Sequence, residues 1–139
     1  MNVAELQQLA NDRLSDAQAL LSLGRRSGAY YLAGYAIECG LKACVLGHVT
    51  RTGVIFTDRK YAERCWTHEV GDLLKLAFLE TSLGMDIASN PALGLNSTAV
   101  TDWTEVSRYH QKTQTEAQRL VDAVGDAANG ILPWIRRHW

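Results

Sequence analysis

Hydrophobic residues recur at intervals of three and four along most of the chain, the spacing of helices that each bury one face. We predict a first helix over residues 3–22 and a central helix over residues 27–48. The central segment carries apolar or small residues on nearly every side, and its only acidic residue is Glu38. A helix that is apolar all round is a buried helix. We therefore expect the rest of the chain to pack around residues 27–48.

An irregular stretch follows over residues 49–67, and the pattern there is weaker. Residues 54–56 are compatible with a short extended piece, and residues 58–64 with one or two helical turns. A third helix is predicted from Thr67, acting as N-cap, to Gly84. Its apolar stripe consists of Val70, Leu73, Leu74, Ala77 and Phe78.

Turn-forming residues fill residues 85–97, among them Asn90-Pro91, Gly94 and Asn96-Ser97. A fourth helix is predicted from residue 97 or 98 to residue 108 or 109. Its inward-facing residues are Val100, Trp103 and Val106, with Tyr109 as a further candidate. A last helix begins near Thr113 and runs to about the chain end, where Pro133 is expected to kink or shorten it.

No stretch alternates apolar and polar residues between hairpin turns, so we predict no β-sheet. The fold class is all-α, an up-and-down bundle of four or five helices. A length of 139 residues fits one domain over residues 1–139, and a hydrophobic fraction of 47% is enough for a packed core. The formal net charge of −1 gives no overall attraction to nucleic acid or acidic membranes, although a local basic patch remains compatible with it.

Three cysteines, Cys39, Cys44 and Cys65, are too few for a disulfide framework and fit a reducing compartment. The first 14 residues have no basic start and no apolar run, unlike a signal peptide. The apolar run of the central helix is shorter than a membrane span, and Glu38 and Lys42 interrupt it. We therefore expect a cytoplasmic protein with no membrane partner.

Glu38 needs a cationic partner, because an unpaired carboxylate is costly to bury. Lys42 lies four residues later on the same helix face. Arg108 is the better candidate, because a guanidinium pairs with a carboxylate through two hydrogen bonds. We favour a structural ion pair that fixes helix register over a catalytic role. No second carboxylate accompanies Glu38, so acid–base catalysis by a carboxylate pair has no support.

Two cysteine–histidine pairs, Cys44 with His48 and Cys65 with His68, superficially resemble zinc ligands. Their spacing is not that of a known zinc finger, and a structural zinc site needs four converging ligands. We therefore expect no metal site and no cofactor.

Histidine and arginine side chains are the residues that can contact RNA or a nucleotide phosphate. Together they can run a metal-free ribonuclease, in which histidine moves the proton and arginine holds the phosphate. Taken singly, each has a structural explanation, in helix capping or in the helix dipole. The residues are His68, His110, His138, Arg64, Arg108, Arg136 and Arg137. Trp134 and Trp139 lie near the chain end and suggest an oligomer contact.

Three segments in series resemble the HEPN domain family of small helical bundles. The first, residues 13–48, has Asp16-Ala17 on a leucine-bearing helix and then a Gly/Ala-rich helix ending Glu38-x-x-Leu41-Lys42-Ala43. The second, residues 67–77, is similar to the family's His-Asp-Leu helix start, with Glu69 in place of the usual Asp. The third is Trp103 followed by Arg108-Tyr109, similar to the Arg-Tyr before the family's last helix.

This resemblance implies a four- or five-helix bundle that usually dimerises. Many members pair with a small nucleotidyltransferase as a toxin–antitoxin module, and others are metal-independent ribonucleases with an Arg-x(4–6)-His motif at the dimer interface. This chain departs from that motif. Arg64 and His68 are separated by three residues, and Arg108 and His110 by one.

Three hypotheses follow from the sequence. The first is a HEPN-like homodimer that binds a nucleotide, RNA or a nucleotidyltransferase antitoxin. The second is a ribonuclease toxin in which Arg108 and His110, or Arg64 and His68, act across the dimer. The third is a non-catalytic helical adaptor. The predicted binding residues are Glu38, Lys42, Arg64, His68, Arg108 and Tyr109, and the predicted catalytic residues are Arg108 and His110.

Overall fold

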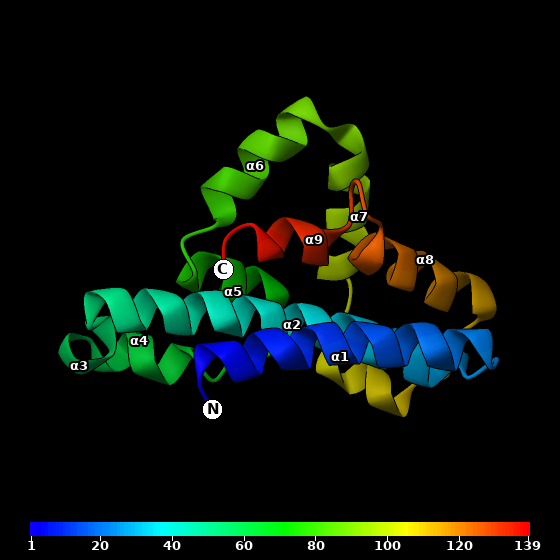
Figure 1. Ribbon diagram of the computed structural model, residues 1–139, viewed down its shortest axis with the longest axis horizontal. Coiled ribbons are helices and arrows are strands. Elements are labelled where there is room, and N and C mark those ends of the chain that lie inside the picture. The colour runs from blue at the N-terminus through cyan, green and yellow to red at the C-terminus, as the bar shows by residue number, and fades with distance from the viewer.

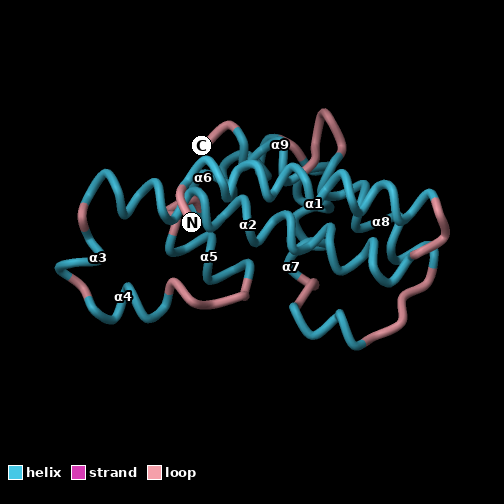
Figure 2. The backbone as a smooth tube through the Cα atoms, turned by 60° about the horizontal axis from the view of Figure 1, so that its bottom comes forward, coloured by secondary structure: helices cyan, strands magenta, loops and turns pink.

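The computed structural model describes all 139 residues, and it contains helices and connecting loops but no strand (Figure 2). The all-α prediction is confirmed. The elements are α1 (Val3–Ser22), α2 (Arg26–Thr52), α3 (Val54–Thr57), α4 (Arg59–Arg64), α5 (Val70–Leu76), α6 (Glu80–Ser89), α7 (Pro91–Thr101), the 3₁₀ helix η1 (Glu105–Tyr109), α8 (Gln114–Gly125) and α9 (Ile131–Arg136).

Helices α1 and α2 form a long antiparallel hairpin that spans the molecule (Figure 1). The turn between them lies at one end of the hairpin, and α3 and α4 lie at the other. Helix α1 has the predicted bounds, and a capping box between Asn2 and Glu5 fixes its start. Gly24 adopts a φ of 74°, a left-handed conformation that glycine reaches without strain, and this reverses the chain.

Helix α2 is the centre of the fold, as the sequence predicts. It contacts α1, α5, η1, α8 and α9, and Ile37 at its middle is fully buried. The helix begins one residue before the predicted range and continues to Thr52, where Gly53 in a left-handed conformation ends it. By length and composition α2 qualifies as a membrane span, but 67% of the qualifying window is buried inside the protein. Burial within the fold accounts for its apolar composition.

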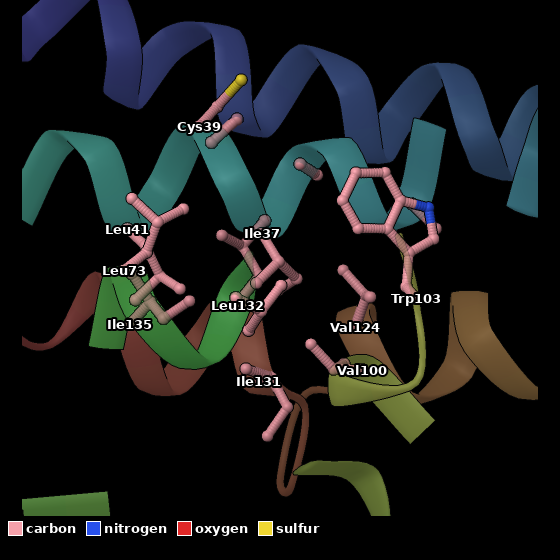
Figure 3. Packing of buried hydrophobic residues seen from close by; sticks show 14 of the residues in the cluster. Ile37, Cys39, Leu41, Leu73, Val100, Trp103, Val124, Ile131, Leu132 and Ile135 are labelled. Atoms are coloured by element: carbon pink, nitrogen blue, oxygen red, sulfur yellow. The ribbon is translucent and has the colours of Figure 1, made fainter. Parts of the chain in front are cut away.

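The buried hydrophobic side chains form one cluster of 34 residues, to which α1, α2, α5, α8 and α9 all contribute. Ile37 and Leu41 of α2 lie opposite Leu73, Leu132 and Ile135 in Figure 3. Trp103 is 1% exposed, and its ring lies directly against Gly34. This glycine therefore provides the space that an indole ring occupies beside α2.

The connection after α2 is helical where an extended piece was predicted. Residues 54–57 form α3, and the predicted turns over residues 58–64 are α4, which Asp58 caps by accepting a hydrogen bond from the Tyr61 amide. Tyr61 is the only buried residue of these two helices, and its hydroxyl donates to the Leu76 carbonyl.

The predicted third helix is divided in two. Helix α5 ends at Leu76, because Phe78 adopts a φ of 59° that no helix continues through. The N-cap is Glu69 rather than Thr67. Residues expected to form turns over 85–97 instead belong to α6 and α7. Asn90 accepts a hydrogen bond from the Leu93 amide and Pro91 occupies the first helical position, so the dipeptide starts a helix.

The predicted fourth helix does not form as one continuous helix. Helix α7 ends at Thr101, and the chain then buries Trp103 and forms only the short helix η1. Val106 and Tyr109 are exposed on η1 instead of facing inward. These two side chains point outward because they belong to a separate 3₁₀ helix and not to a continuous helix that starts at residue 98.

The last predicted helix starts where expected, with a capping box between Thr113 and Glu116. It breaks over residues 126–130, and Pro133 lies in the first turn of the short helix α9, where a missing amide hydrogen is tolerated. The oligomer contact suggested for Trp134 is wrong, because this side chain is 1% exposed and its indole donates to Asp86. The Trp139 indole donates to the Gly40 carbonyl of α2.

Substituting Gly34→Ala tests the close packing of Trp103 on α2. A Cβ at Gly34 would lie 2.2 Å from the indole, so we expect a loss of about 1–3 kcal/mol in the free energy of unfolding. Gly71→Ala is the matched control, because no atom lies within 4 Å of the added methyl group and alanine favours a helix by about 0.5–1 kcal/mol. Urea denaturation measures both. Equal stability of Gly34→Ala and the unmodified protein would contradict this packing.

Candidate functional site

An open hollow of about 790 Å³ lies where the α1–α2 turn meets the residues that follow η1. The turn contributes Arg25, Arg26 and Ser27, and the other side contributes the segment 108–111. Two segments that are more than 80 residues apart in the sequence therefore form one surface. Arg108, Tyr109 and His110, which the sequence analysis singled out, all line this hollow.

One hydrogen bond joins the two sides of the hollow. The Ser27 hydroxyl accepts from the Lys112 backbone amide at 2.9 Å, which ties the start of α2 to the linker before α8. Lys112 also places its ammonium group 4.4 Å from the centre of the Tyr30 ring. On the η1 side, buried Trp103 and Ser107 anchor the chain, so Arg108 and its neighbours are presented outward from a fixed base.

The hollow concentrates positive charge. Its lining includes Arg25, Arg26, Arg108 and His110 but no carboxylate, and none of the three arginines takes part in an ion pair. Unpaired guanidinium groups in the absence of carboxylates are a suitable setting for phosphate. This local charge contrasts with the net charge of −1 of the whole chain.

The start of α2 adds to this field. Arg25 is the N-cap residue and provides no side-chain cap, and the amides of Arg26, Ser27 and Gly28 donate to no acceptor in the chain. The first amides of a long helix carry a partial positive charge and favour anions. They line the same hollow as the arginines, so both features attract the same kind of group.

An aromatic side chain stands beside these cations. Tyr109 is 74% exposed, and the Arg108 guanidinium lies 4.9 Å from the centre of its ring. Hydrogen bonding with Tyr109, and secondarily with Tyr31, raises the pKa of Arg108, which keeps this group charged at every physiological pH. The hollow therefore combines cations that suit a phosphate with a largely exposed aromatic ring.

A second polar cluster lies further along α2. The Glu38 Oε1 atom accepts from Lys42 Nζ at 2.8 Å and is 2.8 Å from His68 Nδ1. Glu38 is 3% exposed, whereas Lys42 is 25% and His68 is 51% exposed. The predicted pairing of Glu38 with Arg108 is wrong. Arg108 lies on η1 with its side chain exposed, whereas Lys42 and His68 contact the Glu38 carboxylate.

The geometry of this cluster orients the His68 ring. A carboxylate oxygen only accepts hydrogen bonds, so in the neutral imidazole the proton lies on Nδ1, and Nε2 has no hydrogen-bond partner in the chain. The second carboxylate oxygen, Glu38 Oε2, is buried without any hydrogen-bond partner. The cluster thus holds His68 in one orientation. It leaves one oxygen of Glu38 buried without a hydrogen bond, which lowers the stability of the fold.

The remaining predicted residues lie apart from both clusters. Arg64 is exposed on α4 with its guanidinium 5.9 Å from the Tyr61 ring centre, and it forms no ion pair. The four residues weighed as zinc ligands do not converge: Cys44 lies near the His138 carbonyl, the His48 ring packs at a tilt against Phe78, and His68 contacts Glu38. No group of three or more histidine, cysteine or carboxylate side chains is placed to hold a metal ion.

Arg25 and Arg26 are functional candidates that sequence reasoning missed, because no motif includes them. A signal for them exists, since two adjacent arginines come directly before the long uncharged start of the central helix. The fold brings them close to Arg108, and their spacing in the sequence does not predict this.

No family model, curated protein or solved structure matches this chain.

Substituting Lys42→Met should destabilise the protein more than Glu38→Gln. Removing Lys42 leaves a buried carboxylate with one partner, and we expect a loss of about 2–3 kcal/mol. Removing the charge of Glu38 leaves Lys42 and His68, whose side chains both reach water, and we expect a loss of about 1 kcal/mol. Urea denaturation at neutral pH compares the two variants. The reverse order would show that Glu38 does not depend on Lys42.

Proposed function

We propose that this chain is a HEPN-like helical protein that binds single-stranded RNA or a nucleotide through the hollow at the start of α2. The observation that carries the proposal is the gathering of three unpaired arginines and His110 around uncapped helix amides, with no carboxylate in the lining. Phosphate contacts of this kind supply most of the affinity of proteins for nucleic acid.

The exposed ring of Tyr109 favours a single strand over a duplex. Bases of a single strand are free to stack on an aromatic side chain, and such stacking contributes about 1–3 kcal/mol per base. In a duplex the base faces are covered by their neighbours, so Tyr109 would have nothing to stack on. The neighbouring Arg108 can hold the phosphate of the same nucleotide.

The wider role in this proposal follows the resemblance of residues 13–48, 67–77 and 103–109 to HEPN domains. We place the protein in the cytoplasm as a single domain that acts as a homodimer. Its partner would be a nucleotidyltransferase antitoxin. The phosphates of a nucleotide that such a partner carries would suit the same hollow. A purely structural adaptor would have no need for unpaired arginines grouped without carboxylates.

Fluorescence anisotropy with a labelled 20-nucleotide single-stranded RNA tests the binding proposal. We expect Arg26→Gln and Arg108→Gln each to weaken binding about 3- to 10-fold and to lower the salt dependence by about 0.7 in log–log slope. We expect Tyr109→Ala to weaken binding about 5-fold or more through lost stacking.

Arg59→Gln is the matched control for these variants. Arg59 is 92% exposed, pairs with Glu63 and lies on α4 at the opposite end of the hairpin (Figure 1). Binding that responds equally to Arg59→Gln would reflect general charge and contradict a specific site. Absence of binding to RNA and to nucleoside triphosphates would refute the proposal.

A second candidate function is metal-independent RNA cleavage, and the contact of His68 with Glu38 favours it. In this reaction a histidine accepts the 2′-hydroxyl proton, the 2′-oxygen attacks phosphorus, and the 5′-oxygen leaves with a proton. His68 has a fixed tautomer and a free Nε2, whereas the exposed His110 makes no side-chain hydrogen bond. His68 is therefore the better placed of the two histidines.

If the protein cleaves RNA, His68→Ala should reduce the rate at least 100-fold, because general base catalysis contributes about 10²–10⁴-fold. His110→Ala should leave the chemical step intact. Gel analysis of end-labelled RNA in the presence of EDTA measures both. Loss of cleavage in His110→Ala alone would assign the reaction to the hollow instead, and an inactive unmodified protein would exclude this function.

A further inference from the structure

One face of α2 joins the basic hollow to the cluster around Glu38. Four of its side chains recur at intervals of four, three and four residues, which is the spacing of one side of a helix. They are Tyr31, Tyr35, Glu38 and Lys42. The segment after α7 and the α4–α5 connection both lie below α2 in Figure 2, separated along its axis. The face therefore runs between the two segments that carry Arg108 and His68.

Two tyrosines continue the surface of the hollow along this face. The ring centre of Tyr31 lies 6.1 Å from that of Trp103, which precedes η1, and the Arg108 guanidinium approaches its hydroxyl. Tyr35 follows one turn later, and its ring is parallel to that of Tyr31, with 6.0 Å between the ring centres. Both tyrosines are partly exposed. An aromatic surface therefore extends from Arg108 toward Glu38.

The far end of this face presents positive and neutral groups to a ligand. Glu38 is 3% exposed and contacts the more exposed Lys42 and His68, so the accessible groups at this end are an ammonium and an imidazole. Burial, with smaller effects of Cys39 and Glu38, raises the pKa of Tyr35 to about 12, which keeps its hydroxyl uncharged at physiological pH. Neither Tyr35 nor the accessible part of the Glu38 cluster therefore repels a phosphate.

We propose that a single strand of RNA bound at the hollow continues along this face, with one base packed against Tyr35 and a backbone phosphate beside Lys42 and His68. This inference rests on the proposed function, because it needs an RNA held at Arg108. Tyr31 and Glu38 are seven residues apart, about 10 Å at 1.5 Å per residue. About three stacked nucleotides span this distance at ~3.4 Å each.

The arrangement selects a strand over a free nucleotide. Cations that hold the backbone, with aromatic side chains between them that pack against bases, are how proteins bind single strands without reading their sequence. A mononucleotide at Arg108 is too short to contact His68 as well. The hollow and the Glu38 cluster thus form one elongated site, in which a strand held at Arg108 has a phosphodiester next to His68 about three nucleotides away.

Photocrosslinking maps the path of the strand. Uridine pentanucleotides with 4-thiouridine at each position in turn are irradiated with the protein, and mass spectrometry locates the linked residues. We expect crosslinks both to the hollow, at Tyr109, and to the face of α2, at Tyr35. Crosslinks confined to the hollow would overturn this inference and leave the proposed function standing.

Tyr35→Leu and Tyr35→Phe form a matched pair, because leucine fills the partly buried position without a ring and phenylalanine keeps the ring. Binding of the labelled 20-nucleotide RNA should weaken about 5-fold or more in Tyr35→Leu, and by no more than about 2-fold in Tyr35→Phe. Circular dichroism verifies that both variants are folded. Phe56→Leu is the control, because this aromatic residue is 92% exposed on α3, at the end of the hairpin far from the hollow (Figure 1).

Uridine monophosphate separates the two parts of the site. It should bind Tyr35→Leu as well as it binds the unmodified protein, because it occupies only the hollow. Equal losses of RNA affinity in Tyr35→Leu and Phe56→Leu, or unchanged RNA affinity in Tyr35→Leu, would overturn the inference. Failure of the unmodified protein to bind any RNA would instead refute the proposed function, and this inference with it.

Discussion

The packing of α2 on all sides is the constraint on which the rest of the structure depends. Helices can surround a central helix only if its side chains are small enough for their backbones to come close. Gly34 accommodates the Trp103 ring, and a Cβ at Gly40 would lie 3.1 Å from Leu132 and 3.3 Å from Ile135. Through these contacts the C-terminal third of the chain packs against the N-terminal hairpin. Larger side chains at Gly34 and Gly40 would prevent this packing, because a close-packed interior has no room for them.

This constraint also limits where α2 can act on a ligand. Its middle is covered, so only its start and its second half contribute to open surface. The start lies in the basic hollow with Arg25 and Arg108. The second half lines an apolar groove of about 330 Å³, where Leu46 lies with Ile55 and Trp66. The chemistry differs because the turn residues are cationic, whereas residues 45–49 of α2 are mostly aliphatic.

The sequence predicts those parts of the fold that local pattern determines. The bounds of α1, the burial of Ile37 and the start of the last helix near Thr113 all follow from periodicity. The division at Phe78 does not, because its left-handed conformation falls on a residue other than glycine, where no sequence pattern marks a break. The pairing of Glu38 with Lys42, one of the two candidates, is confirmed. The pairing with Arg108 is wrong, since the chain breaks after α7 and Arg108 lies on η1, while His68 contacts the carboxylate.

The candidate site was predicted only in part, and the reason is topological. Arg108, Tyr109 and His110 are adjacent in sequence and could be named together, but Arg25 and Arg26 lie beside them only because the folded chain packs η1 and the following segment on α2. Glu38 and His68 come from α2 and the α4–α5 connection and form a cluster of their own.

The basic hollow and the apolar groove lie far apart on α2. Ser27 and Val45 are 18 residues apart on one helix, a separation of about 27 Å at 1.5 Å per residue. A small ligand in one would not reach the other over this distance. Because α2 is packed along its whole middle, it connects the two surfaces as a rigid element rather than a hinge.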